Sequence, residues 1–153
     1  MKITVEISEN CIEDEVVIRC HEINDMVNKI QKAVAEVTTK ETKIELFQNN
    51  KEFYIPIEDI LFFESDGDVI CAHTPSEIFV TKYKLYELEQ ILPWYFSRIS
   101  KSAILNVRKV YSITKNITAS SIVEFKGTPK QVYVSRAYYK PLKSKIEEMR
   151  NVV

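Results

Sequence analysis

The side chains best suited to chemistry in this sequence are hydrogen-bond donors gathered in one stretch, FSRISKSAILNVRK, over residues 96–109. They surround the short apolar run AIL at residues 103–105, and the stretch contains no acidic residue. Such donors pair with phosphate oxygens, and arginine and lysine also recognise guanine edges in the DNA major groove. The donors are Arg98, Ser100, Lys101, Ser102, Asn106, Arg108 and Lys109. The stretch therefore predicts a surface that binds a polyanion.

The net charge of -1 conceals an uneven distribution of charge along the chain. Residues 1–55 carry -4, residues 56–95 carry -6, and residues 96–153 carry +9. A concentrated positive charge favours a nucleic-acid partner, because bound lysine and arginine release counterions from the phosphate backbone. Mutual neutralisation of the acidic and basic segments within the fold explains the same charge pattern equally well.

Motifs that would indicate catalysis are missing from the sequence. It holds no GxSxG, HExxH or GxGxxG motif, and two glycines are too few for a phosphate-binding loop. The three cysteines, Cys11, Cys20 and Cys71, are widely spaced and form no CxxC pair, which argues against a disulfide framework and a zinc site. We therefore expect a binding protein that is not an enzyme and uses no metal or cofactor.

Composition and hydropathy predict a folded, soluble, cytoplasmic protein. The chain has 153 residues, 45% of them apolar, which is enough for one ordinary domain or for one domain with a small appendage. It has no apolar run of 18 residues and no signal peptide, so we expect no membrane insertion.

The elements that must position the donors are mostly short strands. Before residue 40, alternating apolar residues predict strands over residues 1–7 and 15–20, and apolar residues three and four apart predict a helix over 22–37. After residue 43 the pattern predicts antiparallel strands with hairpin turns at Asn49-Asn50 and Asp66-Gly67, and helices over 84–92 and 136–150. The fold class is therefore mostly β with a few helices, and residues 1–40 form a small β-β-α unit ahead of it.

The order of five motifs resembles the LytTR DNA-binding domain of bacterial transcription regulators. They are IPIEDILFFES, VICAHT, KLYELEQIL, FSRISKSAILNVRKVYSI and VYVSRAYYKPLKSKI, and the similarity covers residues 43–150. The resemblance implies an elongated, mostly antiparallel β architecture without a cofactor. It also implies that loops, rather than a recognition helix, enter successive major grooves of bent DNA.

The resemblance also suggests roles for individual residues. In FSRISKSAILN, Arg98 and Ser102 match the family, Ser100 replaces a usual histidine, and Lys101 holds the position that reaches bases or phosphates. Asn106 matches the closing asparagine, which could equally be a structural cap. For Arg98, contact with DNA is favoured over the alternative of an intramolecular ion pair. The stretch 96–109 is expected to form a loop anchored by its apolar residues. Further contacts are implied at Asp68, on a hairpin two residues shorter than usual, and at Arg136, Tyr139 and Lys140.

Two domains and two function classes follow from these observations. Residues 43–153 are expected to form the LytTR-like DNA-binding domain, and residues 1–40 a unit for dimerisation or partner docking, or else an extension of the sheet. The preferred function is a response-regulator-like, sequence-specific transcriptional regulator that binds double-stranded DNA as a homodimer, with a possible regulatory protein partner. The alternative is a protein-interaction module whose basic carboxyl-terminal part docks onto an acidic partner. RNA binding is a weaker third interpretation.

Overall fold

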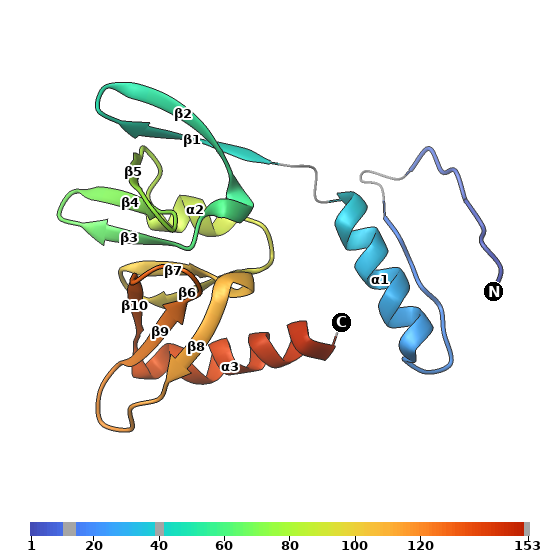
Figure 1. Ribbon diagram of the computed structural model, residues 1–153. Helices are drawn as coiled ribbons and strands as arrows, with labels where there is room; N and C mark the ends of the chain where they lie inside the picture. Colours follow the sequence, from blue (N-terminus) through green and yellow to red (C-terminus); the bar gives the residue numbers. More distant parts are fainter. Residues whose placement is uncertain (11–14, 39–41, 152–153) are drawn as a thin grey trace.

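Antiparallel β-structure dominates this computed structural model, which describes residues 1–10, 15–38 and 42–151. Within these ranges the strands form two sheets, one of seven strands and one of three (Figure 1). The expected fold class, mostly β with a few helices, is confirmed. None of the helices in the described ranges has the length and hydrophobicity needed to cross a membrane.

The seven-stranded sheet has the strand order β2-β1-β5-β4-β3-β7-β6. Its strands are β1 (Lys43–Gln48), β2 (Lys51–Pro56), β3 (Phe62–Asp66), β4 (Val69–His73), β5 (Ile78–Thr81), β6 (Phe96–Ser100) and β7 (Ala103–Asn106). A 3-10 helix, η1 (Ile57–Asp59), leads into β3, and α2 (Leu85–Ile91) joins β5 to β6. All of the strand pairs are antiparallel, so neighbouring strands can be joined by short turns.

Two predicted hairpins are present, one of them shifted by a residue. Asn49 and Asn50 have φ angles of 51° and 62°, as a two-residue turn between β1 and β2 requires. In the next hairpin Asp66 pairs with Val69, so the turn residues are Gly67 and Asp68 rather than Asp66 and Gly67. Gly67 takes a φ of 60°, a conformation that glycine adopts without the steric cost of a side chain.

The three-stranded sheet follows β7 and a second 3-10 helix, η2 (Val107–Lys109). It contains β8 (Val110–Thr114), β9 (Ser121–Phe125) and β10 (Gln131–Val134), with β9 in the middle. The last helix, α3 (Arg136–Asn151), runs along this sheet toward the carboxyl terminus (Figure 1).

Side chains from β3 and β7 supply both faces of the large sheet, because successive residues of a strand point in opposite directions. Phe63 and Ile104 belong to the core shared with Leu88 of α2. Their neighbours Phe62 and Leu105 belong to the second core, which also holds Val123 of β9, and Leu142 of α3 completes that core. The two central strands thus fix both the helix α2 and the small sheet with α3.

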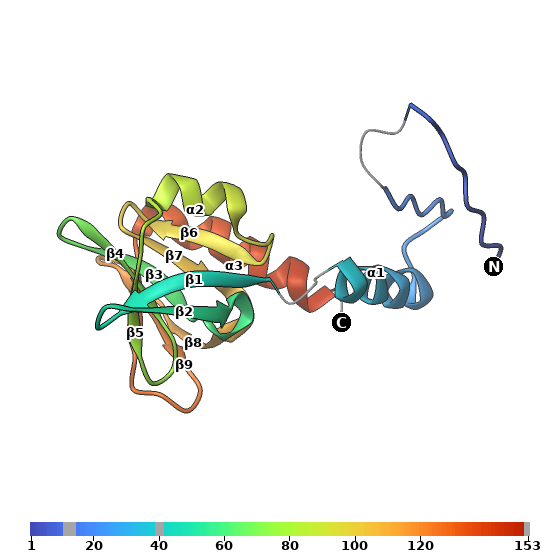
Figure 2. The ribbon, with the colours of Figure 1, turned by 90° about the horizontal axis from the view of Figure 1, so that it is seen from above.

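The amino-terminal part differs from the sequence-based prediction. Helix α1 (Asp25–Thr38) forms, close to the predicted range. The strands predicted over residues 1–7 and 15–20 were wrong for this structure, since residues 1–8 and 15–20 form no strand pairing among the described residues. Alternation fixes which face is apolar, but a strand also needs a partner for its backbone groups. Figure 2 shows α1 and these residues to one side of the β-rich part, with α1 next to the end of α3 and the amino terminus farther away. The division into two units near residue 40 stays a prediction.

His73 gives the protein a testable response to pH. Its ring stacks on Phe62 at 4.2 Å between centroids, and its Nδ1 atom is buried without a hydrogen-bond partner among the described residues. Burial, followed by the charge of Lys130, lowers the pKa of His73 from 6.5 to about 4. Because the unfolded chain takes up this proton first, folding stability should fall as the pH drops from about 6.5 to 4.

The expected loss is roughly 2 kcal/mol, reduced from the full linkage value because the ring is not completely buried. Denaturation midpoints measured between pH 7 and 4 check this result. In a His73→Gln variant the decline should be much weaker, whereas the exposed His21→Gln variant should behave like the parent. Glu64, whose pKa is raised by burial and by Asp66, acts in the opposite direction, because the folded protein takes up its proton more readily than the unfolded chain. An equal decline in parent and His73→Gln would contradict this assignment.

Candidate nucleic-acid interface

The donor-rich stretch forms a β-hairpin followed by a 3-10 helix, and the expectation of a loop was wrong. β6 and β7 pair around a turn at Lys101 and Ser102, with an irregularity in register between Arg98 and Ser100. The residues of β7 are buried, so they hold the hairpin in the sheet. Only the turn itself and parts of β6 and η2 remain available to a partner.

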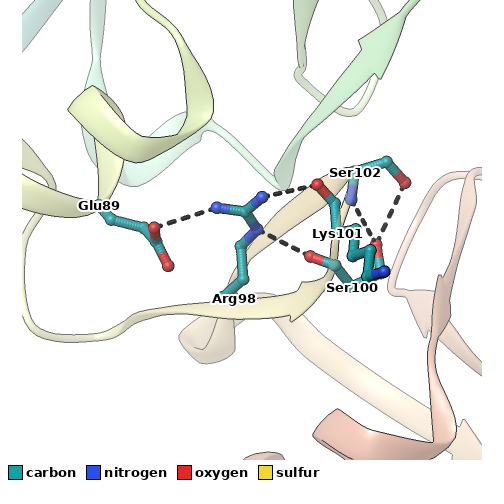
Figure 3. A network of polar contacts seen from close by, with 5 residues as sticks. All are labelled: Glu89, Arg98, Ser100, Lys101 and Ser102. Carbon is teal, nitrogen blue, oxygen red and sulfur yellow. Dashed lines mark hydrogen bonds and ion pairs between the residues drawn. The ribbon is translucent and has the colours of Figure 1, made fainter.

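Arg98 organises the turn (Figure 3). Its Nε atom donates to the carbonyl oxygen of Ser100 at 2.7 Å and its Nη2 atom to that of Lys101 at 2.6 Å. The remaining Nη1 atom forms an ion pair with Glu89 of α2 at 3.0 Å. The Ser102 amide donates to Ser100 Oγ at 3.1 Å, and the two hydroxyls lie 3.2 Å apart. The guanidinium therefore holds the backbone of the turn in one shape.

Two backbone hydrogen bonds place this turn between other elements that carry predicted contacts. The Ser65 amide, near the end of β3, donates to the Ser102 carbonyl at 2.8 Å. The Ser135 amide, directly before α3, donates to the Ile99 carbonyl at 2.9 Å. The structure therefore gathers the β3–β4 turn, the β6–β7 turn and the start of α3 at one end of the molecule. We call this end the turn surface; it carries Ser100, Lys101, Ser102, Asp68 and Arg136.

Lys101 and Arg136 are the free cations of the turn surface. Both side chains are exposed, and neither forms an ion pair with any residue in the described part of the chain. Ordinary exposed ion pairs contribute little, so an unpaired cation is easily shared with an incoming phosphate or base. Asp68 is also exposed, in the turn between β3 and β4, where it adds an acceptor to this end.

Asn106 does not belong to this surface, and the prediction that it contacts DNA was wrong. Its side chain is completely buried. Its Nδ2 atom donates to the carbonyl oxygens of Ile60 at 2.9 Å and Glu58 at 3.3 Å, and its Oδ1 atom accepts from the Arg108 amide at 3.1 Å. The residue caps η2 and ties it to η1, which leaves no donor for a ligand.

Arg108 and Lys109 lie on η2, at the opposite end of β7 from the turn surface. The Arg108 guanidinium is 4.0 Å from the centroid of the Tyr95 ring and forms an ion pair with Glu58 at 3.2 Å. Lys109 is exposed. The structure therefore separates these two cations from Arg136 and also from Lys101, which belongs to the same sequence motif.

Residues further along α3 divide between core and surface. Tyr139 is half-buried against the second core, and its ring lies 5.1 Å from the ammonium of Lys115. Lys140 is exposed.

Sequence reasoning missed Glu89 and Glu58, because nothing local in the chain links them to Arg98 and Arg108. The sequence offers only a general signal for such partners: a guanidinium that is partly removed from water needs a carboxylate nearby.

Comparisons with known proteins find relatives for both the sequence and the fold of this chain. A family model described as the LytTr DNA-binding domain matches residues 50–147. An uncharacterized HTH-type transcriptional regulator of Staphylococcus aureus strain NCTC 8325 is 30% identical over 148 residues, covering 95% of this chain and 98% of the relative. Its counterpart in the bovine strain RF122 is 32% identical over 149 residues, with the same coverage. A solved LytTr DNA-binding domain from Bacillus cereus superposes with a TM-score of 0.64 at 19% identity, over 70% of this chain and 98% of that one.

Proposed function

This chain belongs to the LytTR family of DNA-binding domains, and from this premise we propose that it is a sequence-specific transcriptional regulator of double-stranded DNA. The observation that carries the proposal is the turn surface, where exposed Lys101 and Arg136 lie on neighbouring elements and neither forms an ion pair with a described residue. The protein binds and does not catalyse. It works in the bacterial cytoplasm, where chromosomal DNA is accessible.

Turns and the start of α3 enter successive major grooves in this proposal. Arg136 and Lys101 reach guanine edges or phosphates, and Asp68 accepts a hydrogen bond from a cytosine amino group. Support comes from the order of elements: in the described residues, strands separate α1 from α2 and α2 from α3. No described pair of helices is therefore joined by the short turn of a helix-turn-helix, despite the naming of the relatives.

Two copies bind paired half-sites as a homodimer in the proposed mode. Operators for two-fold symmetric proteins carry two half-sites spaced by about one helical turn or a multiple of it. A single turn surface offers few base contacts, so two copies together supply the specificity that a regulator needs among many competing sites. Residues 1–40 are proposed to serve dimerisation or the docking of a regulatory protein.

Binding-site selection from random duplexes with the full chain tests the proposal. We expect an enriched motif with two half-sites, and an affinity for it that falls with salt at a log-log slope of about -0.9 per phosphate neutralised. A folded protein that enriches no motif, even at low salt, would refute sequence-specific binding. Equal affinity for an acidic polypeptide such as polyglutamate would instead favour the alternative, a module that docks onto an acidic partner.

Arg98 is expected to act on DNA binding by positioning Lys101 rather than by touching DNA. Replacement by alanine or by lysine should each weaken binding to the selected duplex about 5-fold, since ordering one flexible side chain costs roughly 1 kcal/mol. Lysine keeps the charge but cannot reproduce the three contacts that Arg98 makes. Hydrogen exchange of the Ser102 amide should accelerate in both variants.

Arg108→Ala is the matched control for this prediction, because it removes the same charge from η2. It should leave Ser102 exchange unchanged. If Arg98→Lys binds like the parent while Arg98→Ala does not, the charge of Arg98 itself matters and the positioning role is wrong.

A further inference from the structure

The first residues of the chain expose a series of apolar side chains and pair with no strand in the described part of the chain. Met1, Ile3, Val5 and Ile7 alternate with Lys2, Thr4 and Glu6, the pattern of a strand with one apolar face. All four apolar side chains are more than four-fifths exposed, at 81%, 88%, 82% and 96%. Isolated apolar residues on a surface are common, but a contiguous row of this kind marks an interaction site.

Helix α1 has an apolar stripe that is covered only in part. Val27 is 5% exposed, and Val16 and Ile18 lie beside Val34 and Ala35 on one side of the stripe. On the other side Met26 and Val37 are 56% and 80% exposed. A second apolar layer is therefore needed to complete the packing of this helix.

The sequence of residues 1–7 is complementary to itself when two copies run antiparallel. With Thr4 opposite Thr4, Lys2 of each copy lies opposite Glu6 of the other, and the apolar residues lie opposite apolar residues on the other face. Directly opposed residues in an antiparallel pair share a face, and opposite charges there are favourable. Moving the centre by one residue, to Ile3 or Val5, loses the Lys2–Glu6 pairs. A register centred on Lys2 or on Glu6 would place that residue opposite its own copy, so that two like charges face each other.

We propose that residues 1–7 pair with the same residues of a second copy of this chain, as a two-stranded antiparallel ribbon centred on Thr4. Its apolar face, made of Met1, Ile3, Val5 and Ile7, covers the exposed side of the stripe on α1 in each copy. That contact is required, since a two-stranded ribbon alone is only marginally stable in water. The inference deepens the homodimer of the proposed function, while the pairing itself needs no DNA.

Disulfide trapping of the full chain tests the register. In a Cys11→Ser, Cys20→Ser background, Thr4→Cys should give covalent dimers in most chains under mild oxidation. Directly opposed Cα atoms lie about 4.5–5.5 Å apart, within the range that a disulfide spans. Glu6→Cys alone should not crosslink, since its two copies lie roughly 13 Å apart. Mixing Lys2→Cys with Glu6→Cys should give heterodimers.

Charge reversal gives a second, reversible readout by sedimentation equilibrium without DNA. Lys2→Glu should weaken dimerisation about 10-fold, because two favourable pairs become repulsive. The double variant Lys2→Glu, Glu6→Lys should restore it. A monomeric parent, or crosslinking through Glu6→Cys as efficient as through Thr4→Cys, overturns the proposal. If such a chain still selects a DNA motif, the proposed function stands without this pairing.

Discussion

Replacing Lys101 or Arg136 with alanine is expected to weaken binding to the selected duplex roughly 5- to 150-fold for each variant. This range corresponds to about 1–3 kcal/mol for a lost base contact. Both side chains are exposed and unpaired within the described chain, so the free energy of unfolding should change by less than about 0.5 kcal/mol. Fluorescence anisotropy with a labelled duplex and thermal denaturation measure the two quantities.

Lys109→Ala is the control for this first prediction. It removes the same charge from an exposed lysine of η2, at the far end of β7 from the turn surface. We expect it to reduce the affinity for DNA less than 3-fold, because it only makes the overall electrostatic potential less positive and removes no direct contact. A loss equal to that of Lys101→Ala would mean that DNA lies across η2, and the turn surface would then be the wrong interface.

Asn106→Ala is expected to lower stability by about 3 kcal/mol without a matching loss of DNA affinity in the folded protein. The substitution removes the partner of the buried Ile60 carbonyl oxygen, which costs about 1–3 kcal/mol, and of two partly buried groups, the Glu58 carbonyl and the Arg108 amide, which cost less. For a domain of this size the melting temperature should fall by roughly 10 °C. Denaturation curves give the stability, and duplex titration well below the melting temperature gives the affinity.

Asn116→Ala is the matched control for the second prediction. Asn116 lies in the exposed loop between β8 and β9, where its Oδ1 atom accepts from the Thr118 amide at 3.1 Å. Water replaces that contact, so stability should change by less than about 0.5 kcal/mol. If Asn106→Ala keeps full stability but loses DNA affinity, the asparagine acts in recognition and its structural role is wrong.

Local patterns were enough to predict most elements between residues 43 and 151. Alternation places Ile44 and Leu46 on the buried face of β1, and Asn49-Asn50 supplies the positive φ angles of the turn that follows. These properties depend on residues a few positions apart, which a sequence displays directly. The same order of local motifs carried the family resemblance that the comparisons confirm.

Long-range contacts decided which donors remain available to a partner. Arg98 and Arg108 are equally basic in the sequence, but Glu89 and Glu58 occupy their guanidinium groups, and Glu58 lies 50 residues before Arg108. Asn106 is polar in the sequence and completely buried in the fold. Lys101 and Arg136 lie on elements that backbone hydrogen bonds bring together at one end of the molecule, and neither forms an ion pair within the described chain, although Asp68 lies at the same end.

The amino-terminal segment shows the same difference between a local sequence pattern and the contacts that surround it. The sequence determines that Ile3, Val5 and Ile7 would share one face of a strand. Whether a strand exists depends on a neighbour that satisfies its backbone hydrogen bonds, and the tertiary structure of one chain supplies none to the described residues 1–8. Periodicity is a property of the chain itself, whereas pairing and burial belong to the surroundings that folding creates.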